Sequence, residues 1–189
     1  MNKLNRSAET QTCFYGEERL HKMEKVIIIG CSGAGKSTLA RKLGDKLDLP
    51  VVHLDRLWWT AGWKNVTREE FDERLGRALA MEQWIIDGNY SRTMEARLQK
   101  CDTIIYLDFN RWQCLLGMLQ RVIGSYGRVR PDMAKGCPER FDWEFVKWIW
   151  NFNKENRVRN YIWIAKAKHA ETIVLKNRRE VKRFLQSLK

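Results

Sequence analysis

The sequence has 189 residues, of which 44% are hydrophobic and 31% charged, and a formal net charge of +12. A chain of this length and composition builds one globular core, which excludes both a disordered protein and two full-sized domains. Its apolar runs are far shorter than the roughly 20 residues that span a bilayer, which excludes an integral membrane protein.

The cysteines and the distribution of charge indicate the cellular compartment and the classes of binding partner. The five cysteines include no C-x-x-C pair, which argues against a disulfide framework or a zinc site and favours the reducing cytoplasm. Residues 126–189 hold 16 Lys or Arg against 7 Asp or Glu, a net charge of +9. This basic half attracts polyanions, and charge alone does not choose among phosphorylated small molecules, nucleic acid and an anionic membrane surface.

The first part of the chain, residues 1–23, contains acidic residues and no apolar stretch of the signal-peptide type. We predict that it forms a flexible N-terminal extension. Residues 24–189 then make a single domain.

Strands and helices are predicted to alternate along this domain. Five short apolar runs indicate strands buried on both faces, and Thr67 with Glu70 and Asn177 with Glu180 have the spacing of helix N-terminal caps. The strands are expected at Lys25–Gly30, 50–55, 84–88, 103–108 and 172–176. Helices are expected at Lys36–Leu47, after Thr67, after Ser91, at 112–122, at 142–168 in one or two pieces, and after Asn177. This order predicts a parallel sheet with helices on both faces and a ligand site beyond the carboxyl ends of its strands.

The junction between the first strand and the first helix carries a phosphate-binding motif. Residues 30–38 read G-C-S-G-A-G-K-S-T and satisfy G-x-x-x-x-G-K-[ST] in the required strand-to-helix context. Glycines let backbone N–H groups converge on phosphate oxygens, and the helix N-terminus adds a partial positive charge. We predict that Lys36 reaches the β- and γ-phosphates of ATP and that the Ser37 hydroxyl ligates Mg²⁺. The predicted nucleotide-binding residues are Gly30, Ser32, Gly33, Ala34, Gly35, Lys36, Ser37 and Thr38.

Three aspartates close predicted strands: Asp55, Asp87 and Asp108. An acid on a strand near the phosphate loop holds Mg²⁺ in such proteins, and Asp87 is the first choice for this metal role. Asp108 is either a second metal candidate or a cap for the following helix. Asp55 is either the base that orients or deprotonates an acceptor hydroxyl, or a turn cap.

Arginines bracket a glycine-containing loop at about residues 124–140, which we predict to be a lid. Arg121, Arg128 and Arg130 are the expected catalytic cations, because the planar guanidinium binds phosphate through two N–H groups. The alternative is that they are ordinary exposed loop arginines. Arg157 and Arg159 are weaker candidates for the same task.

Tryptophans form two groups in the sequence. Trp58, Trp59 and Trp63 follow Asp55 and either wall an acceptor pocket or fill a core. The second group stands among basic residues, a mixture that also suits nucleic acid; it comprises Trp143, Trp148, Trp150 and Trp163.

These motifs together resemble one bacterial family. The resemblance is to the DNA topology modulation proteins, a family similar to adenylate and shikimate kinases. It is carried by the phosphate loop, His53–Asp55, 58–63, 85–90, Arg130–Met133 and 136–140. The resemblance runs from about residue 25 to residue 189. It implies a phosphotransferase with core, acceptor-binding and lid regions, whereas the family name reflects a regulatory association with DNA topology.

The match to adenylate kinases is partial. Asp87-Gly88 and the run from Arg121 to Gly124 match their third-strand end and lid entrance. The proline-arginine that follows the aspartate-glycine pair is replaced by residues 89–92, Asn-Tyr-Ser-Arg, and the segment between the second and third strands is shorter. Both departures lie on the monophosphate side of the site and argue against AMP as the acceptor.

The sequence therefore predicts an α/β P-loop NTPase fold in three layers, with a five-stranded parallel sheet and a lid of the nucleoside monophosphate kinase type. The predicted function is transfer of the γ-phosphate of ATP, with Mg²⁺, to a nucleotide or other small molecule. A nucleotide-controlled protein that binds DNA and affects its topology is the alternative, with nucleic acid as its partner. No membrane partner is expected, and the sequence does not determine the oligomeric state or the acceptor.

Overall fold

The computed structural model describes residues 23–188, and the predicted extension therefore lies almost wholly outside the described residues. Five parallel strands form one sheet in the order β2-β5-β1-β6-β7. Their bounds are β1 Lys25–Gly30, β2 Val51–His53, β5 Trp84–Asp87, β6 Thr103–Leu107 and β7 Glu171–Leu175. A separate antiparallel hairpin consists of β3 Trp59–Thr60 and β4 Lys64–Asn65.

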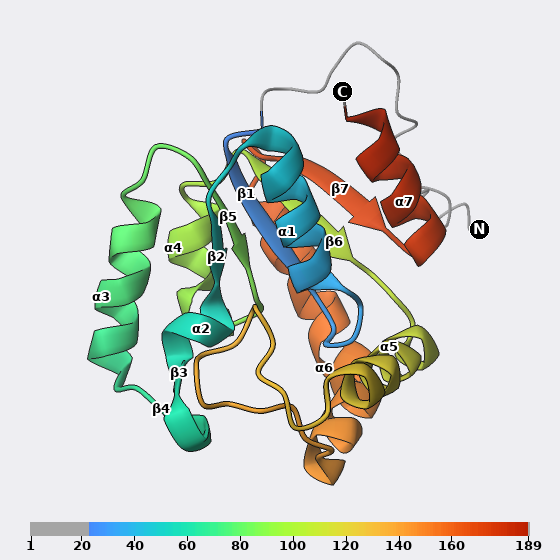
Figure 1. The fold of residues 1–189 in the computed structure, drawn as a ribbon. Coiled ribbons are helices and arrows are strands. Elements are labelled where there is room, and N and C mark those ends of the chain that lie inside the picture. The colour runs from blue at the N-terminus through green and yellow to red at the C-terminus, as the bar shows by residue number, and fades with distance from the viewer. Residues whose placement is uncertain (1–22, 189) are drawn as a thin grey trace, which may run out of the picture.

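Helices cover both faces of the sheet (Figure 1). They are α1 Lys36–Leu47, α2 Leu54–Trp58, α3 Arg68–Leu79, α4 Met94–Leu98, α5 Arg111–Ser125, α6 Trp143–Lys166 and α7 Arg178–Ser187. Two short 3₁₀ helices, Ala61–Trp63 and Ser91–Thr93, complete the fold. Among residues 23–188, no helix is both long enough and apolar enough to cross a membrane.

The central strand β1 explains why the sheet forms. Four consecutive residues, Val26 to Ile29, are fully buried, and alternate side chains enter two separate hydrophobic cores. Val26 and Ile28 pack with α1, α5 and α7, whereas Ile27 and Ile29 pack with α3 and α4. Burying such a side chain contributes about 1.5–3 kcal/mol, so both layers of helices are anchored on this strand.

Several predicted elements differ in detail. The second strand ends at His53, and the residues after it form α2, so Asp55 lies in the first turn of a helix rather than at a strand end. Leu54 is fully buried against Gly88, and this contact favours the helical turn. Ser91 begins a 3₁₀ helix and makes no side-chain cap, while residues 143–166 form one uninterrupted helix. The predicted caps at Thr67 and Asn177 are confirmed.

A buried arginine fixes the loop that follows β5. Arg97 is 0% exposed, and its guanidinium donates to the carbonyl oxygens of Gly88 at 2.9 Å, Asn89 at 2.5 Å and Tyr90 at 3.1 Å. Burial lowers the pKa of Arg97 to about 10. The sequence pattern contained no sign of this role, because an arginine on a short helix is usually exposed.

We predict that Arg97→Met lowers the free energy of unfolding by about 2–3 kcal/mol, because carbonyl groups that face the protein interior lose their donor. Denaturant unfolding measures this change. The control is Arg92→Ala, which removes an exposed ion pair with Asp72 and should cost at most about 1 kcal/mol. Equal losses in the two variants would contradict the proposed role of Arg97.

Candidate active site

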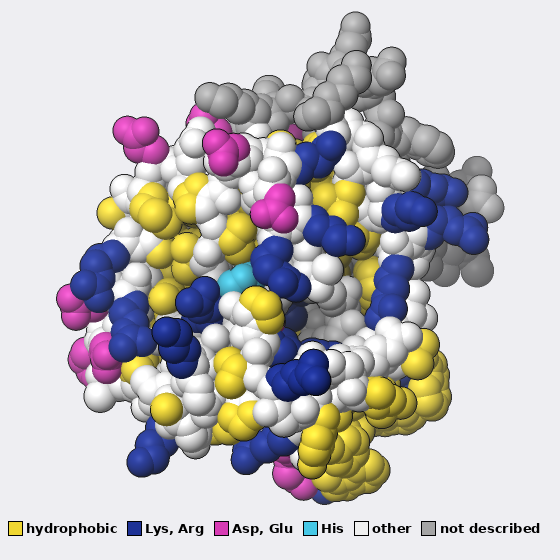
Figure 2. Space-filling model, viewed as in Figure 1, with side chains coloured by type: hydrophobic (Ala, Val, Ile, Leu, Met, Phe, Trp, Pro, Cys, Tyr) yellow, Lys and Arg dark blue, Asp and Glu magenta, His cyan; other side chains and the backbone are white. Residues whose placement is uncertain are grey.

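A cavity of about 920 Å³ opens at the carboxyl ends of the central strands. The phosphate loop forms its floor, and α2, α5, α7 and the lid loop contribute its walls. Figure 2 shows Lys and Arg side chains around the hollow on this face. The basic residues among its lining are Lys36, Arg41, Lys42, Lys46, Arg121, Arg130, Arg178 and Lys182.

The phosphate loop has the backbone that its sequence predicts. Gly33 and Gly35 have positive φ angles of 81° and 96°, which favour glycine. A Cβ atom on Gly33 would lie 2.0 Å from the carbonyl oxygen of Cys114, so α5 packs directly on the loop. No side chain caps the N-terminus of α1, which leaves its backbone N–H groups for an anion. The Lys36 ammonium stays at the loop by donating to the Cys31 carbonyl oxygen at 3.2 Å.

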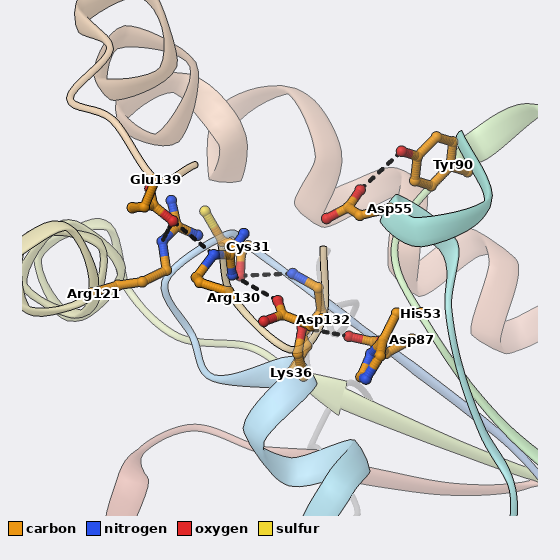
Figure 3. A network of polar contacts seen from close by, with 11 residues as sticks. Cys31, Lys36, His53, Asp55, Asp87, Tyr90, Arg121, Arg130, Asp132 and Glu139 are labelled. Atoms are coloured by element: carbon orange, nitrogen blue, oxygen red, sulfur yellow. Dashed lines mark hydrogen bonds and ion pairs between the residues drawn. The ribbon is translucent and has the colours of Figure 1, made fainter. Parts of the chain in front are cut away.

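Asp87 and Ser37 form the candidate metal site. The Ser37 hydroxyl donates to Asp87 Oδ2 at 2.7 Å. His53 Nδ1 lies 2.5 Å from Asp87 Oδ1, and Figure 3 shows these two side chains together. Because β2 and β5 pair in parallel with His53 opposite Asp87, the sheet itself places the imidazole beside the carboxylate. A hydroxyl and a carboxylate oxygen are ligands that Mg²⁺ accepts alongside phosphate oxygens, so these residues fit the ion.

Asp108 has a different place. Its carboxylate is buried and binds Arg157, with the closest contact at 2.8 Å, and the Tyr161 hydroxyl, also at 2.8 Å. These contacts tie β6 to α6. The cap of α5 is Asn110, which exchanges hydrogen bonds with Gln113, so the alternative cap role of Asp108 is wrong. Asp108 is not part of the cavity lining.

Asp55 projects into the cavity from α2 and accepts a 2.8 Å hydrogen bond from the Tyr90 hydroxyl. Burial raises the pKa of Asp55, and the bond from Tyr90 and the charge of Lys36 partly offset this rise. Tyr90 has a φ of 28°, an unusual backbone conformation for a tyrosine, and Arg97 binds its carbonyl oxygen. The aromatic side chain is thereby held in place beside the carboxylate.

Asn89 explains part of the departure from the adenylate kinase pattern. Its side-chain oxygen accepts from the Gly30 N–H at 3.1 Å, and its side-chain nitrogen donates to the Gly30 carbonyl oxygen at 2.9 Å. The loop after β5 is therefore bound to the start of the phosphate loop. Sequence reasoning assigned no task to Asn89, because this pairing joins residues 59 positions apart.

The loop predicted to be a lid, called the lid loop, crosses from α5 to α6, and two of the three predicted arginines line the cavity. Arg121 and Arg130 both contact the buried carboxylate of Glu139, at 3.2 Å and 2.7 Å, and Arg130 also donates to Asp132 at 2.6 Å. Burial, and the nearby charge of Arg130, lower the pKa of Arg121. The Arg128 side chain is exposed and does not line the cavity, so its catalytic role stays a prediction.

The tryptophans after Asp55 pack against protein rather than lining the cavity. Trp58 meets Phe71 edge to face, with ring centroids 5.4 Å apart. Trp63 donates to the Pro138 carbonyl oxygen at 3.2 Å, which links the β3–β4 hairpin to the lid loop. The sequence allows these tryptophans either to wall an acceptor pocket or to fill a core, and their contacts support packing within the protein.

The comparisons with known proteins concern the fold. No protein-family model matches the chain, and no curated protein matches it. Among solved structures, the chain is similar to shikimate kinase from Bacteroides thetaiotaomicron, at 18% sequence identity and a TM-score of 0.50, with 88% of this chain and 96% of that chain covered. It is also similar to a gluconokinase from Sinorhizobium meliloti 1021, at 11% identity and a TM-score of 0.52, with 87% and 89% covered.

These likenesses and the sheet topology establish that the chain has the P-loop kinase fold, with a five-stranded parallel sheet between layers of helices. The predicted fold class is confirmed. The resemblance to DNA topology modulation proteins rests on the sequence motifs and stays a prediction, as does a special likeness to adenylate kinases.

Proposed function

We propose that this protein is an ATP-dependent phosphotransferase that moves the γ-phosphate of ATP to a hydroxyl group of a small molecule or nucleotide. The observation that carries the proposal is that one cavity contains a phosphate loop, a buried carboxylate at Asp55 and two arginines, Arg121 and Arg130. These are the donor site, the base and the cations that phosphoryl transfer needs. The two similar structures are both named as kinases, which agrees with this proposal.

On the donor side, the backbone N–H groups of the phosphate loop bind the phosphate oxygens, and Lys36 adds its charge to the terminal phosphates. Ser37 and Asp87 would hold Mg²⁺. When bound, the ion would neutralise the negative charge that develops on the β- and γ-phosphates. His53, bound to Asp87, keeps that carboxylate in place.

On the acceptor side, Asp55 accepts the proton of the attacking hydroxyl. Its hydrogen bond with Tyr90 orients the carboxylate. Arg121 and Arg130 stabilise the charge on the transferring phosphate when the lid covers the cavity. Arg128 joins them only if the loop moves, because its side chain is exposed in this structure.

We predict that Lys36→Ala weakens binding of magnesium-loaded ATP by about 10- to 100-fold, the size of a charge-assisted hydrogen bond of about 1.5–3 kcal/mol. Isothermal titration calorimetry measures the affinity. The control is Arg77→Ala on the exposed face of α3, which should bind as the wild type does. Wild-type protein that gives no binding signal with MgATP would remove the proposed donor site.

We predict that Tyr90→Phe moves the acid limb of the pH profile to higher pH. Asp55 must be ionised to accept a proton, and burial already raises its pKa. The Tyr90 hydroxyl stabilises the ionised form, so its removal raises the pKa further and activity is lost at a higher pH. The measurement is log kcat/KM against pH, with exposed Tyr126→Phe as the control. An unmoved acid limb would argue against Asp55 as the base.

A second candidate function is nucleic-acid binding. Exposed tryptophans of α5 and α6 lie near cations: Arg111 stands over the ring of Trp150, 4.8 Å from its centroid, and Trp112 contacts Trp150 edge to face. If duplex DNA binds there, log K falls linearly with log salt concentration, and Trp150→Ala weakens the affinity. Fluorescence anisotropy with labelled duplex at several salt concentrations tests this, and absence of a salt slope would reject it.

A further inference from the structure

Resting on the proposed phosphotransfer, we infer that the acceptor is an uncharged hydroxyl compound, of the kind represented by sugars, polyols and nucleosides, and that the lid carboxylates Asp132 and Glu139 make the site reject anionic acceptors. The starting observation is the balance of charge around Asp55. An acceptor that carries a phosphate or carboxylate needs a cation that is not already neutralised.

The lid supplies two cations to this end of the cavity, and both are paired. Arg130 contacts Asp132 at 2.6 Å and Glu139 at 2.7 Å, while Arg121 contacts the same Glu139 oxygen at 3.2 Å. Two arginines therefore meet two carboxylates (Figure 3). Asp132 and Glu139 are each about 5% exposed, so water screens these pairs little.

Four arginines from α2, α3 and the segment after β5 have other partners or lie outside the cavity lining. Arg92 holds Asp72 through two N–H groups at 2.6 Å and 2.8 Å, and Arg97 is fully buried against main-chain carbonyl oxygens. Arg74 binds Glu70 and the Leu57 carbonyl oxygen. Arg56 follows Asp55 directly, but its side chain is exposed and does not line the cavity.

Six other basic residues line the cavity. Lys36 belongs to the phosphate loop and is assigned to the donor phosphates, Arg41 lies on α1, and the other four lie on α1 and α7. Arg178 and Lys182 belong to α7, which follows β7 at one edge of the sheet, whereas α2 follows β2 at the opposite edge. Lys42 and Lys46 lie on α1, which packs with α7. These cations suit the donor polyphosphate rather than a group beside Asp55.

Once Lys36 is committed to the phosphates of ATP, the charge that remains beside Asp55 is negative. Within residues 23–188 Asp55 forms no ion pair, and the nearby carboxylate of Asp87 is bound to Ser37 and His53. A neutral hydroxyl compound donates hydrogen bonds to Asp55 at no electrostatic cost. The Asp55 carboxylate would repel an anionic acceptor. Because Asp132 and Glu139 neutralise Arg130, this arginine does not offset the repulsion, and the site therefore selects against anionic acceptors.

The transferring phosphate is not excluded by this arrangement. Arg130 uses Nη1 for Asp132 and Nε for Glu139. A guanidinium has five N–H donors, so the Nη2 group, which neither of these contacts uses, can bind the phosphate of bound ATP.

The test compares matched neutral and anionic compounds as acceptors: D-glucose with D-gluconate, xylitol with xylonate, and adenosine with AMP. Phosphate transfer from ATP labelled at the γ-phosphate is measured for each with magnesium present. We expect kcat/KM at least about tenfold higher for the neutral member of a pair that reacts. Preference for the anionic member would overturn the inference, and so would transfer to no compound by protein that binds MgATP. Protein that binds no MgATP would instead overturn the proposed function itself.

Neutralising the lid carboxylates tests the stated cause. Asp132→Asn with Glu139→Gln leaves Arg130 and Arg121 unpaired, and we expect the preference for the neutral member to fall at least about tenfold. Asp132→Asn alone is the milder variant, and thermal melting verifies that each variant is folded. The matched control is Glu144→Gln, an exposed acid on α6. An unchanged preference in a folded double variant would remove Asp132 and Glu139 as the source of selectivity.

Discussion

The parallel pairing of β1 between β5 and β6 is the constraint on which the rest of this structure depends. In this register Ile28 lies opposite Asp87, and on the next strand His53 lies opposite Asp87 as well. The strand ends therefore meet at one edge, directly below the phosphate loop that begins at Gly30. A one-residue slip of this register would move the metal candidate Asp87 to the other face of the sheet.

The same edge is held by contacts made after the strands end. Asn89 binds both main-chain groups of Gly30, and Arg97 binds the carbonyl oxygens of the loop that contains Asn89. On the other side, α5 approaches the phosphate loop so closely that Cβ atoms on Gly33 and Gly117 would each collide with backbone of the other element. Because α5 also carries Arg121, the start of the predicted lid is packed against the phosphate loop.

Charge is divided among separate places in the cavity. The phosphate loop offers N–H groups and Lys36, and Asp87 has a hydroxyl and an imidazole as partners. Among residues 23–188, the side chain hydrogen-bonded to Asp55 is that of Tyr90. The lid arginines have carboxylates of their own. The cavity of a basic chain thus contains a carboxylate, Asp55, that forms no ion pair among the described residues, which the net charge of +12 does not suggest.

The sequence by itself determined the strand-to-helix motif at residues 30–38, the alternation of strands and helices, and two of the helix caps, because these features depend on residues close together in the chain. It left open or misjudged features that depend on distant partners. Asp55 lies on a helix because Leu54 packs against Gly88, and Asp108 is bound by Arg157 from 49 residues away. Only the tertiary structure decided which aspartate faces which partner, since a strand-end carboxylate carries no local signal of the side chain that folding brings to it.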